Sequence, residues 1–139
     1  LIEAGEGDDK IVGGAGADSI TGNGGNDIIV GNGGADILHG ALGNDTLSGG
    51  SGADNFRFSD GLGVFGNDVV TDLSFAEGDS LTFILGGQTT KVSSLAELNA
   101  LISSTGATVS QDSVSATITF GTDESVKLIG FTAPGGVIA

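Results

Sequence analysis

A nine-residue repeat runs through residues 4–57 and constrains the fold more than any other feature of the chain. Six copies follow one another without an insertion, each with glycine at its fourth position, aspartate at its sixth and an apolar residue at its eighth. The aspartates are Asp9, Asp18, Asp27, Asp36, Asp45 and Asp54. The copies match the nonapeptide G-G-x-G-x-D-x-U-x, in which U is a large apolar residue, and this pattern indicates a parallel β-coil.

Each nonamer divides into a glycine-rich turn of six residues and a strand of three. Glycine permits the positive φ angles and the close backbone contacts of a tight turn, and the middle residue of the strand points inward. Two nonamers complete one flattened coil, so repeats eighteen residues apart stack. Asp9, Asp27 and Asp45 then form one column, and the other three aspartates form a second. The predicted fold is mainly β, a right-handed parallel β-roll over residues 1–58.

The two aspartate columns require a cation. Stacked carboxylates repel one another, and like charges at one site disfavour ionisation. Carboxylate and turn carbonyl oxygens suit calcium, which takes six to eight oxygen ligands. The chain has no cysteine and one histidine, so the usual zinc ligands are missing. Magnesium fits less well because it requires tight octahedral geometry and keeps its waters. The alternative, a glycine-rich chain without metal, does not explain why aspartate and aliphatic residues keep fixed phases.

Residues 4–57 resemble the RTX (repeats-in-toxin) region of proteins that bacterial type I secretion exports. The resemblance implies a parallel β-roll in which each calcium ion takes one aspartate and two carbonyls from each of two turns on the same side. Six repeats then give four complete sites. Their aspartate pairs are Asp9 with Asp27, Asp18 with Asp36, Asp27 with Asp45, and Asp36 with Asp54.

The same resemblance assigns the carbonyl ligands. The lower turn would give the carbonyls of positions two and four, and the upper turn those of positions one and three. The lower set is Gly5, Gly7, Gly14, Gly16, Asn23, Gly25, Asn32 and Gly34. The upper set is Gly22, Gly24, Gly31, Gly33, Gly40, Leu42, Gly49 and Ser51. Ala41 tolerates a left-handed conformation poorly and Leu42 stands where a small residue is usual, so we expect turn 40–45 to deviate most.

The charge of the chain excludes several functions. The net charge is −14, and four calcium ions would reduce it to −6. Such an acidic chain is unsuited to nucleic acid, whose phosphates need Lys and Arg, or to an anionic membrane surface. No stretch approaches the roughly 18 apolar residues of a membrane span. Because no cysteine is present, we expect metal rather than disulfides to stabilise the small core.

The first three residues fit positions seven to nine of a preceding repeat, with Ile2 at the inward position. They include neither an initiating Met nor a basic region, so no N-terminal signal peptide is visible. These features predict that the chain derives from a longer protein.

The second half, 59–139, is predicted to be a β-rich cap with one short helix. The order of its features resembles, more loosely than the repeats do, the region that follows the repeats in RTX proteins, and this resemblance associates it with type I secretion. The helix is expected over 94–103, with Ser94 and Glu97 as a capping box and Gly106 as its stop. We expect 55–59 to form a strand that leaves the roll, 68–73 and 80–85 to flank a turn at 76–79, and a hairpin to turn at 121–124. The aromatic residues expected to fill the core of the cap are Phe58, Phe65, Phe75, Phe83, Phe120 and Phe131.

Catalytic chemistry is not predicted within this chain. His39 occupies position nine of a repeat and is expected to face solvent, where a catalytic triad has no pocket. Asp72 and Asp79 could form a carboxylate pair for sugar hydrolysis, but the turn around Asp79 favours a turn-capping or peripheral calcium role. Ile28, Val30 and Ile37 form an outward apolar spot, which we expect to pack within the full protein.

Three functional hypotheses remain open at this point. The first is a calcium-folded structural module at the C-terminal end of a large exported protein. The second is the accessory part of a secreted enzyme such as a protease, lipase or epimerase. The third is the end of an adhesin or S-layer protein, in which calcium stiffens a rod. In each case the resemblance implies the surface or exterior of a Gram-negative bacterium. The expected partners are calcium and the type I secretion machinery, with neither nucleic acid nor membrane insertion, and the fragment is expected to be monomeric.

Overall fold

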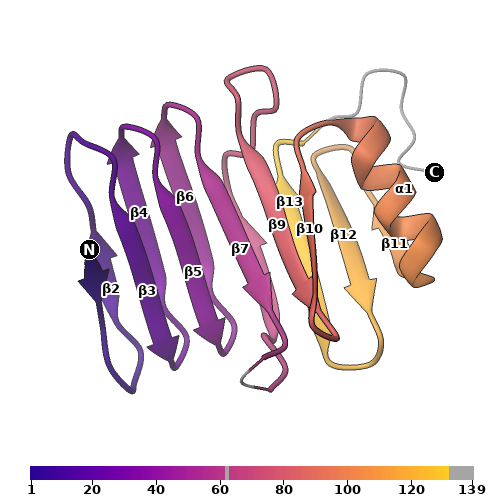
Figure 1. The fold of residues 1–139 in the computed structure, drawn as a ribbon, viewed down its shortest axis with the longest axis horizontal. Helices are drawn as coiled ribbons and strands as arrows, with labels where there is room; N and C mark the ends of the chain where they lie inside the picture. The colour runs from indigo at the N-terminus through magenta and orange to yellow at the C-terminus, as the bar shows by residue number, and fades with distance from the viewer. Residues whose placement is uncertain (62, 132–139) are drawn as a thin grey trace.

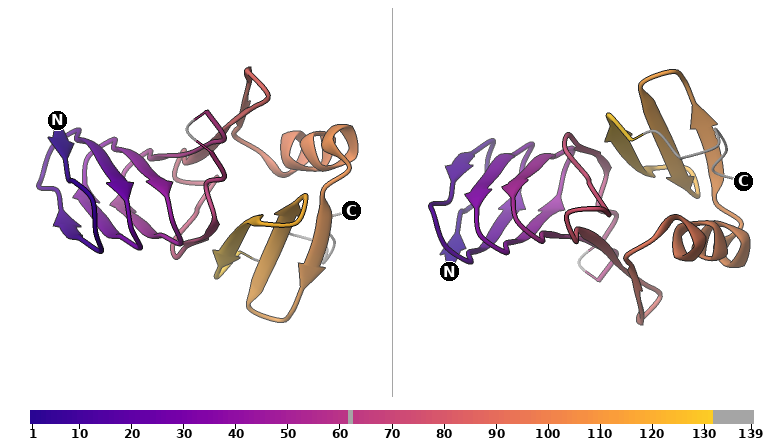
Figure 2. Two further views of the ribbon diagram at one scale, coloured as in Figure 1. Left: turned by 90° about the horizontal axis from the view of Figure 1, so that it is seen from below. Right: turned by 90° about the horizontal axis from the view of Figure 1, so that it is seen from above.

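The computed structural model describes residues 1–61 and 63–131, and this part of the chain forms thirteen β-strands and one α-helix. The strands make two sheets, which face each other across the roll and continue into the C-terminal part (Figures 1 and 2). The first sheet contains, in spatial order, β1 (Ile2–Glu3), β3 (Ser19–Gly24), β5 (Ile37–Leu42), β7 (Asn55–Ser59), β9 (Ser80–Leu85) and β10 (Gln88–Val92). The second contains β11 (Thr108–Gln111), β12 (Ser115–Phe120), β13 (Glu124–Ile129), β8 (Asn67–Val70), β6 (Thr46–Ser51), β4 (Ile28–Gly33) and β2 (Lys10–Val12).

Successive repeats enter opposite sheets, which confirms the parallel β-roll. Ile20 pairs in parallel with Leu38 in one sheet, and Ile29 pairs with Leu47 in the other. Both pairs join residues eighteen positions apart, as two nonamers per coil require. The inward eighth residues of the repeats are all buried: Ile11, Ile20, Ile29, Leu38, Leu47 and Phe56.

Several strands are longer than three residues because they extend into the glycine turns. Gly25 N–H donates to the Leu42 carbonyl at 3.0 Å, and Gly34 N–H donates to the Ser51 carbonyl at the same distance. At position two, Asn23 and Ala41 both have φ of 80°. The expectation that turn 40–45 deviates is therefore wrong at this position, because pairing with the turn below holds Ala41 in the left-handed region.

The roll continues past the last nonapeptide. Val70 of β8 pairs in parallel with Leu47, and Leu81 of β9 pairs in parallel with Phe56. The strands predicted at 68–73 and 80–85 thus lie in opposite sheets instead of pairing with each other. Likewise, β7 does not leave the roll, because it lies between β5 and β9 in the first sheet. The expected domain boundary at residue 58 falls inside β7.

The remaining elements close the C-terminal end of the roll. Gly86 and Gly87 connect β9 to β10, which pair as an antiparallel hairpin. Strands β11, β12 and β13 form an antiparallel unit, and β13 adds in parallel to β8. The predicted hairpin at 121–124 joins β12 to β13. Strands β10 and β11 were not predicted from the sequence.

Helix α1 (Leu95–Thr105) lies at the end of the molecule opposite the N-terminus (Figures 1 and 2). Ser94 Oγ accepts a hydrogen bond from Glu97 N–H at 3.3 Å, as predicted. The Glu97 carboxylate accepts from Ser93 N–H at 2.6 Å, one residue before the N-cap position of a capping box. Gly106 ends the helix with φ of 70°, and the buried face consists of Leu98, Leu101 and Ile102.

Phenylalanine side chains join roll and cap in one core. Phe58 stacks on Phe83 with ring centroids 5.2 Å apart, and Phe83 contacts Phe120 at 5.1 Å. Phe65 lies 5.7 Å from Phe58, which links the loop after β7 to the same cluster. Phe75 and Phe131 form a separate pair 5.6 Å apart. Within residues 1–61 and 63–131, no helix is long and apolar enough to cross a membrane.

Candidate calcium sites

The six repeat aspartates form two hydrogen-bonded ladders. In each ladder the backbone N–H of one aspartate donates to Oδ1 of the aspartate in the next turn on the same side. The distances are 2.8 Å for Asp9 to Asp27, 2.8 Å for Asp18 to Asp36, 2.8 Å for Asp27 to Asp45, and 2.9 Å for Asp36 to Asp54. Every aspartate pair that the sequence assigned to one ion is therefore adjacent in the structure.

The second carboxylate oxygens of four aspartates are buried without a partner. Asp27, Asp36, Asp45 and Asp54 are each 1% exposed, and their Oδ2 atoms accept no hydrogen bond from residues 1–61 and 63–131. Leaving a buried carboxylate oxygen without a partner costs more than about 1–3 kcal/mol, because charged groups are costlier than neutral ones. A cation between the turns would supply that partner.

Glycine at position one makes room for such a cation. A methyl group added to Gly22 would overlap Asp27 Oδ2 and lie 2.8 Å from the Gly40 carbonyl oxygen. A methyl group on Gly31 would likewise overlap Asp36 Oδ2 and lie 2.6 Å from the Gly49 carbonyl oxygen. A carboxylate oxygen from the lower turn and a position-one carbonyl from the upper turn thus face the same small space. These hard oxygen donors fit calcium.

Carbonyls at positions two and three already accept backbone hydrogen bonds. Gly24 N–H donates to the Gly5 carbonyl at 3.3 Å, and Gly25 N–H donates to the Leu42 carbonyl at 3.0 Å. A carbonyl oxygen has two lone pairs, so such a bond leaves one free for a metal. In the described residues, no three acidic or histidine side chains approach closely enough to hold a metal. Each candidate site instead offers two carboxylates, and its other ligands would be carbonyls.

Burial disfavours the charged form of these carboxylates. It raises the pKa of Asp45 to about 6, with a smaller contribution from repulsion by Asp27, although the hydrogen bond from Asp27 N–H opposes the shift. Burial also raises the pKa of Asp54, and the negative charges of Asp79, Asp36 and Asp72 add to it. A divalent cation would reverse this penalty because it favours the ionised carboxylate.

Two further aspartates, which the sequence reading did not assign to the columns, extend both ladders. Asp45 N–H donates to Asp68 Oδ1 at 2.9 Å, and Asp54 N–H donates to Asp79 Oδ1 at 2.9 Å. Asp68 is 2% exposed and Asp79 is 3% exposed, and burial raises the pKa of Asp68 to about 8. The sequence does contain a signal for these two turns. GVFGNDVVT (63–71) and SFAEGDSLT (74–82) each have an aspartate at position six and an apolar residue at position eight, as the nonapeptides do.

Asp72 and Asp79 bind backbone groups, as the turn-capping interpretation predicts. The Asp72 carboxylate accepts from Gly49 N–H at 3.0 Å and Gly50 N–H at 2.9 Å. Asp79 Oδ2 accepts from Ser74 N–H at 2.8 Å. Both carboxylates therefore organise turns of the roll, and the carboxylate pair for sugar hydrolysis finds no support.

His39 and the three residues of the predicted apolar spot lie on the outer faces of the sheets. His39 is half-buried rather than fully exposed, because Thr21 and Arg57 flank it in the neighbouring strands. Its Nε2 is buried without a hydrogen-bond partner, and burial and the charge of Arg57 lower its pKa. Ile28 and Ile37 are 46% and 40% exposed, and Val30 is half-buried. Ile28 and Val30 lie in β4 and Ile37 lies in β5 of the opposite sheet, so the prediction that the three form one apolar spot is wrong.

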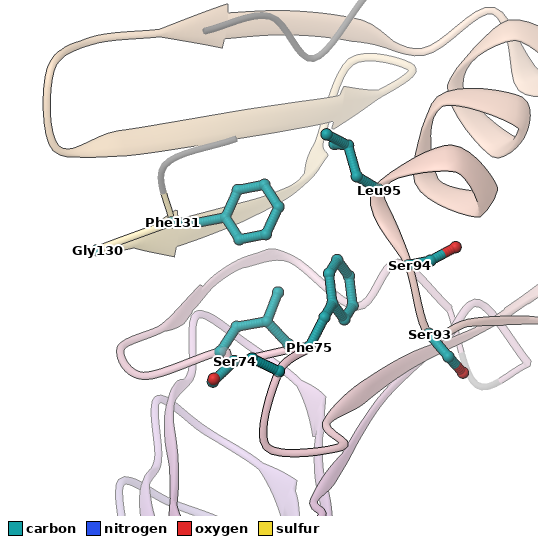
Figure 3. Close-up of a pocket in the computed structure, with 9 residues that line it drawn as sticks. Ser74, Phe75, Ser93, Ser94, Leu95, Gly130 and Phe131 are labelled. Atoms are coloured by element: carbon teal, nitrogen blue, oxygen red, sulfur yellow. The ribbon is translucent and has the colours of Figure 1, made fainter. Parts of the chain in front are cut away.

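A pocket of about 520 Å³ lies between the segment 73–76 and the C-terminal cap (Figure 3). The rings of Phe75 and Phe131 line it together with Leu73, Leu95 and three serines. Its described lining has no acidic, basic or histidine side chain, so it offers no group for acid–base chemistry or for calcium.

The close contacts around Gly22 lead to a testable prediction. We expect Gly22→Ala to displace the Asp27 carboxylate and to remove the ion above Gly22, and at most also the ion of the Asp9–Asp27 pair, with a loss of stability of about 1–3 kcal/mol from the added methyl group. Gly5→Ala is the matched control, because a methyl group there meets nothing within 4 Å. Isothermal titration with calcium measures both variants. Equal ion counts for the two would show that the space above Gly22 holds no ion.

Comparisons with known proteins agree with this geometry. The family model of the RTX calcium-binding nonapeptide repeat matches residues 3–38 and 30–61. The solution structure of the AlgE6R3 subunit of the Azotobacter vinelandii mannuronan C5-epimerase is 29% identical, with a TM-score of 0.58, and the match covers 90% of this chain and 72% of that one. The crystal structure of the extracellular lipase LipA from Serratia marcescens is 25% identical, with a TM-score of 0.65.

The lipase match covers 96% of this chain but only 19% of the lipase, so the chain spans about a fifth of that protein. The comparison with curated protein sequences returns no match. The matching family is a calcium-binding repeat, which is a structural module and not a catalytic one. Residues 3–61 therefore belong to the RTX calcium-binding nonapeptide repeats, and the chain folds as an RTX β-roll.

Proposed function

We propose that this chain is a structural module that folds when calcium binds between its turns after export from the cell. The observation that carries the proposal is the set of four buried Oδ2 atoms without a partner. Each belongs to an aspartate whose Oδ1 already accepts a backbone hydrogen bond, so the chain itself leaves one oxygen per carboxylate for a cation.

The calcium concentration outside the cell would act as the folding signal. Extracellular calcium modules bind with dissociation constants of about 10⁻⁴–10⁻³ M, well above cytosolic calcium. Four ions between the stacked repeat turns would reduce the net charge from −14 to −6. The chain would pass the type I secretion machinery unfolded and would fold at the surface or outside of a Gram-negative bacterium. Residues 59–139 would cap the roll and lie next to the export signal.

Two parent proteins are compatible with this role. One is a large exported protein of adhesin or S-layer type, in which the loaded roll acts as a stiff end. The other is a secreted enzyme in which the roll is an accessory domain. The second has a specific observation in its favour, because the two similar structures are named as a subunit of an epimerase and as a lipase. The domain that precedes this one in a full-length protein would decide between them.

Calcium counting by equilibrium dialysis tests the proposed function. We expect Asp27→Asn to bind two ions fewer than the unchanged chain, because Asp27 belongs to the pairs with Asp9 and with Asp45. Asp9→Asn should lose one ion. The control is Asp112→Asn, whose carboxylate is exposed and, among the described residues, accepts bonds only from Val114 and Ser115. A chain that binds no calcium at millimolar concentration would contradict the proposal.

A further inference from the structure

We propose that the calcium array extends beyond the nonapeptides by two ions, one between Asp45 and Asp68 and one between Asp54 and Asp79. The inference rests on the proposed calcium-binding function and adds two specific sites to it. In both added sites the upper turn departs from the nonapeptide pattern, and both join the roll to the first strands of the C-terminal half.

The unpartnered Oδ2 atoms indicate which gaps between turns would hold an ion. At Gly13, Gly22 and Gly31, Oδ2 of the lower aspartate lies beside the position-one carbonyl of the upper turn, so Oδ2 faces the gap above it. At Gly40 and Gly49, the atoms nearest to an added methyl group all belong to Asp45 or Asp54. Four sites within the repeats would then use Oδ2 of Asp9, Asp18, Asp27 and Asp36. Oδ2 of Asp9 and Asp18 accept from Gly5 N–H at 3.4 Å and from Gly14 N–H at 2.9 Å. The unpartnered buried oxygens belong to Asp27, Asp36, Asp45 and Asp54. Two of them therefore face gaps that no pair of nonapeptides encloses.

Asp68 and Asp79 close these two gaps from above. Their Oδ1 atoms accept from Asp45 N–H and Asp54 N–H at 2.9 Å, which matches the 2.8–2.9 Å bonds within the repeats. The strands that follow them keep the parallel pairing, with Val69 beside Thr46 and Ser80 beside Asn55. The frame that positions the aspartates in the four internal sites is thus repeated in both gaps.

Turn 63–68 also has the backbone contact made by the fourth-position glycine in the repeats. A methyl group on Gly66 would overlap the Gly43 carbonyl oxygen, as a methyl group on Gly43 would overlap that of Gly25. Gly66 therefore stands at position four of a seventh turn, although the loop before it is longer. The offset from Asp45 to Asp68 is 23 residues instead of 18.

No positive side chain compensates the charges in these gaps. In the described residues, Asp45, Asp54, Asp68 and Asp79 accept hydrogen bonds only from backbone N–H groups. All four are at most 3% exposed, so water has little access to them. One divalent cation per gap would more than offset the charge of the eight ladder aspartates, and six ions in total would bring the net charge of the chain from −14 to −2.

Counting bound calcium on the full chain tests this inference. Equilibrium dialysis at saturating calcium should give six ions for the unchanged chain, five for Asp68→Asn, five for Asp79→Asn and four for the double variant. Asparagine keeps an oxygen that can accept from Asp45 or Asp54 N–H but removes the negative charge. Asp112→Asn should keep six ions and serves as the matched control.

The outcomes separate this inference from the proposed function. Four ions in the unchanged chain, with no loss in Asp68→Asn or Asp79→Asn, would overturn the two added sites and leave the function intact. No bound calcium at all would overturn both. Circular dichroism at saturating calcium shows whether each variant folds. If a variant does not fold, the count for the unchanged chain decides alone, since six supports the two added sites and four overturns them.

Discussion

Removal of calcium is expected to unfold this chain almost completely, and millimolar calcium is expected to restore it. Four aspartates with unpartnered oxygens are buried within the turns, and two more close the ladders. Without a cation these carboxylates must either repel one another or take up protons, and both responses oppose the stacked turns. Each site at a calcium concentration 100 times its dissociation constant adds about 2.7 kcal/mol, so several sites together match the whole stability of a small domain.

Far-ultraviolet circular dichroism in excess chelator, followed by titration with calcium, measures this change. We expect a disordered spectrum in chelator and a strong β signal in millimolar calcium. Magnesium at the same concentration controls for general divalent charge, and 1 M NaCl controls for screening, which at that ionic strength acts beyond about 3 Å. Neither should restore the β signal. A full β signal in chelator would show that the roll is stable without a metal.

The repeat region could be predicted from the sequence in nearly all respects. One inward residue per nonamer sets the phase, and two nonamers per coil place Ile20 beside Leu38 and Asp27 beside Asp45. These relations follow from local periodicity alone, because each coil contacts only the coils before and after it. Even the pairs of aspartates could be assigned, since stacking leaves each one a single neighbour above and below.

The two added turns could not be predicted in the same way. Insertions move Asp68 and Asp79 off the ninefold phase, with offsets of 23 and 25 residues from their partners. Once the phase is lost, a segment such as 68–73 reads only as an apolar strand, and its partner depends on tertiary contacts. The structure shows that partner to be β6, through the pairing of Leu47 with Val70.

Strands β10 and β11 were missed for a different reason. Four of the five residues of β10 are exposed, as are three of the four residues of β11, so neither shows an alternating apolar pattern. Each is an edge strand held by antiparallel pairing with one neighbour. The helix was predictable because its start and stop have local chemical causes in Ser94 and Gly106.

Truncation after Ser59 is expected to abolish cooperative folding even in millimolar calcium. The truncated chain lacks β8 and β9, so the backbone edges of β6 and β7 lose their partners. Phe56 and Phe58, which are fully buried in the whole chain, lose their cover, including the stack of Phe58 on Phe83. Exposing one such side chain costs about 1.5–3 kcal/mol, a large share of the total stability of a small domain.

A second truncation after Gly87 separates the contribution of the added turns from that of the rest of the cap. It keeps β8, β9, Asp68, Asp79 and Phe83, but it loses the strand β13 that pairs with β8. The calcium midpoint and the melting temperature should therefore fall between those of the whole chain and the chain that ends at Ser59. If the shortest chain has the same midpoint and melting behaviour as the whole, residues 60–139 contribute nothing to the roll. The shared phenylalanine cluster and the continuous sheets argue against that result, because they make the end of the roll and the start of the cap a single core.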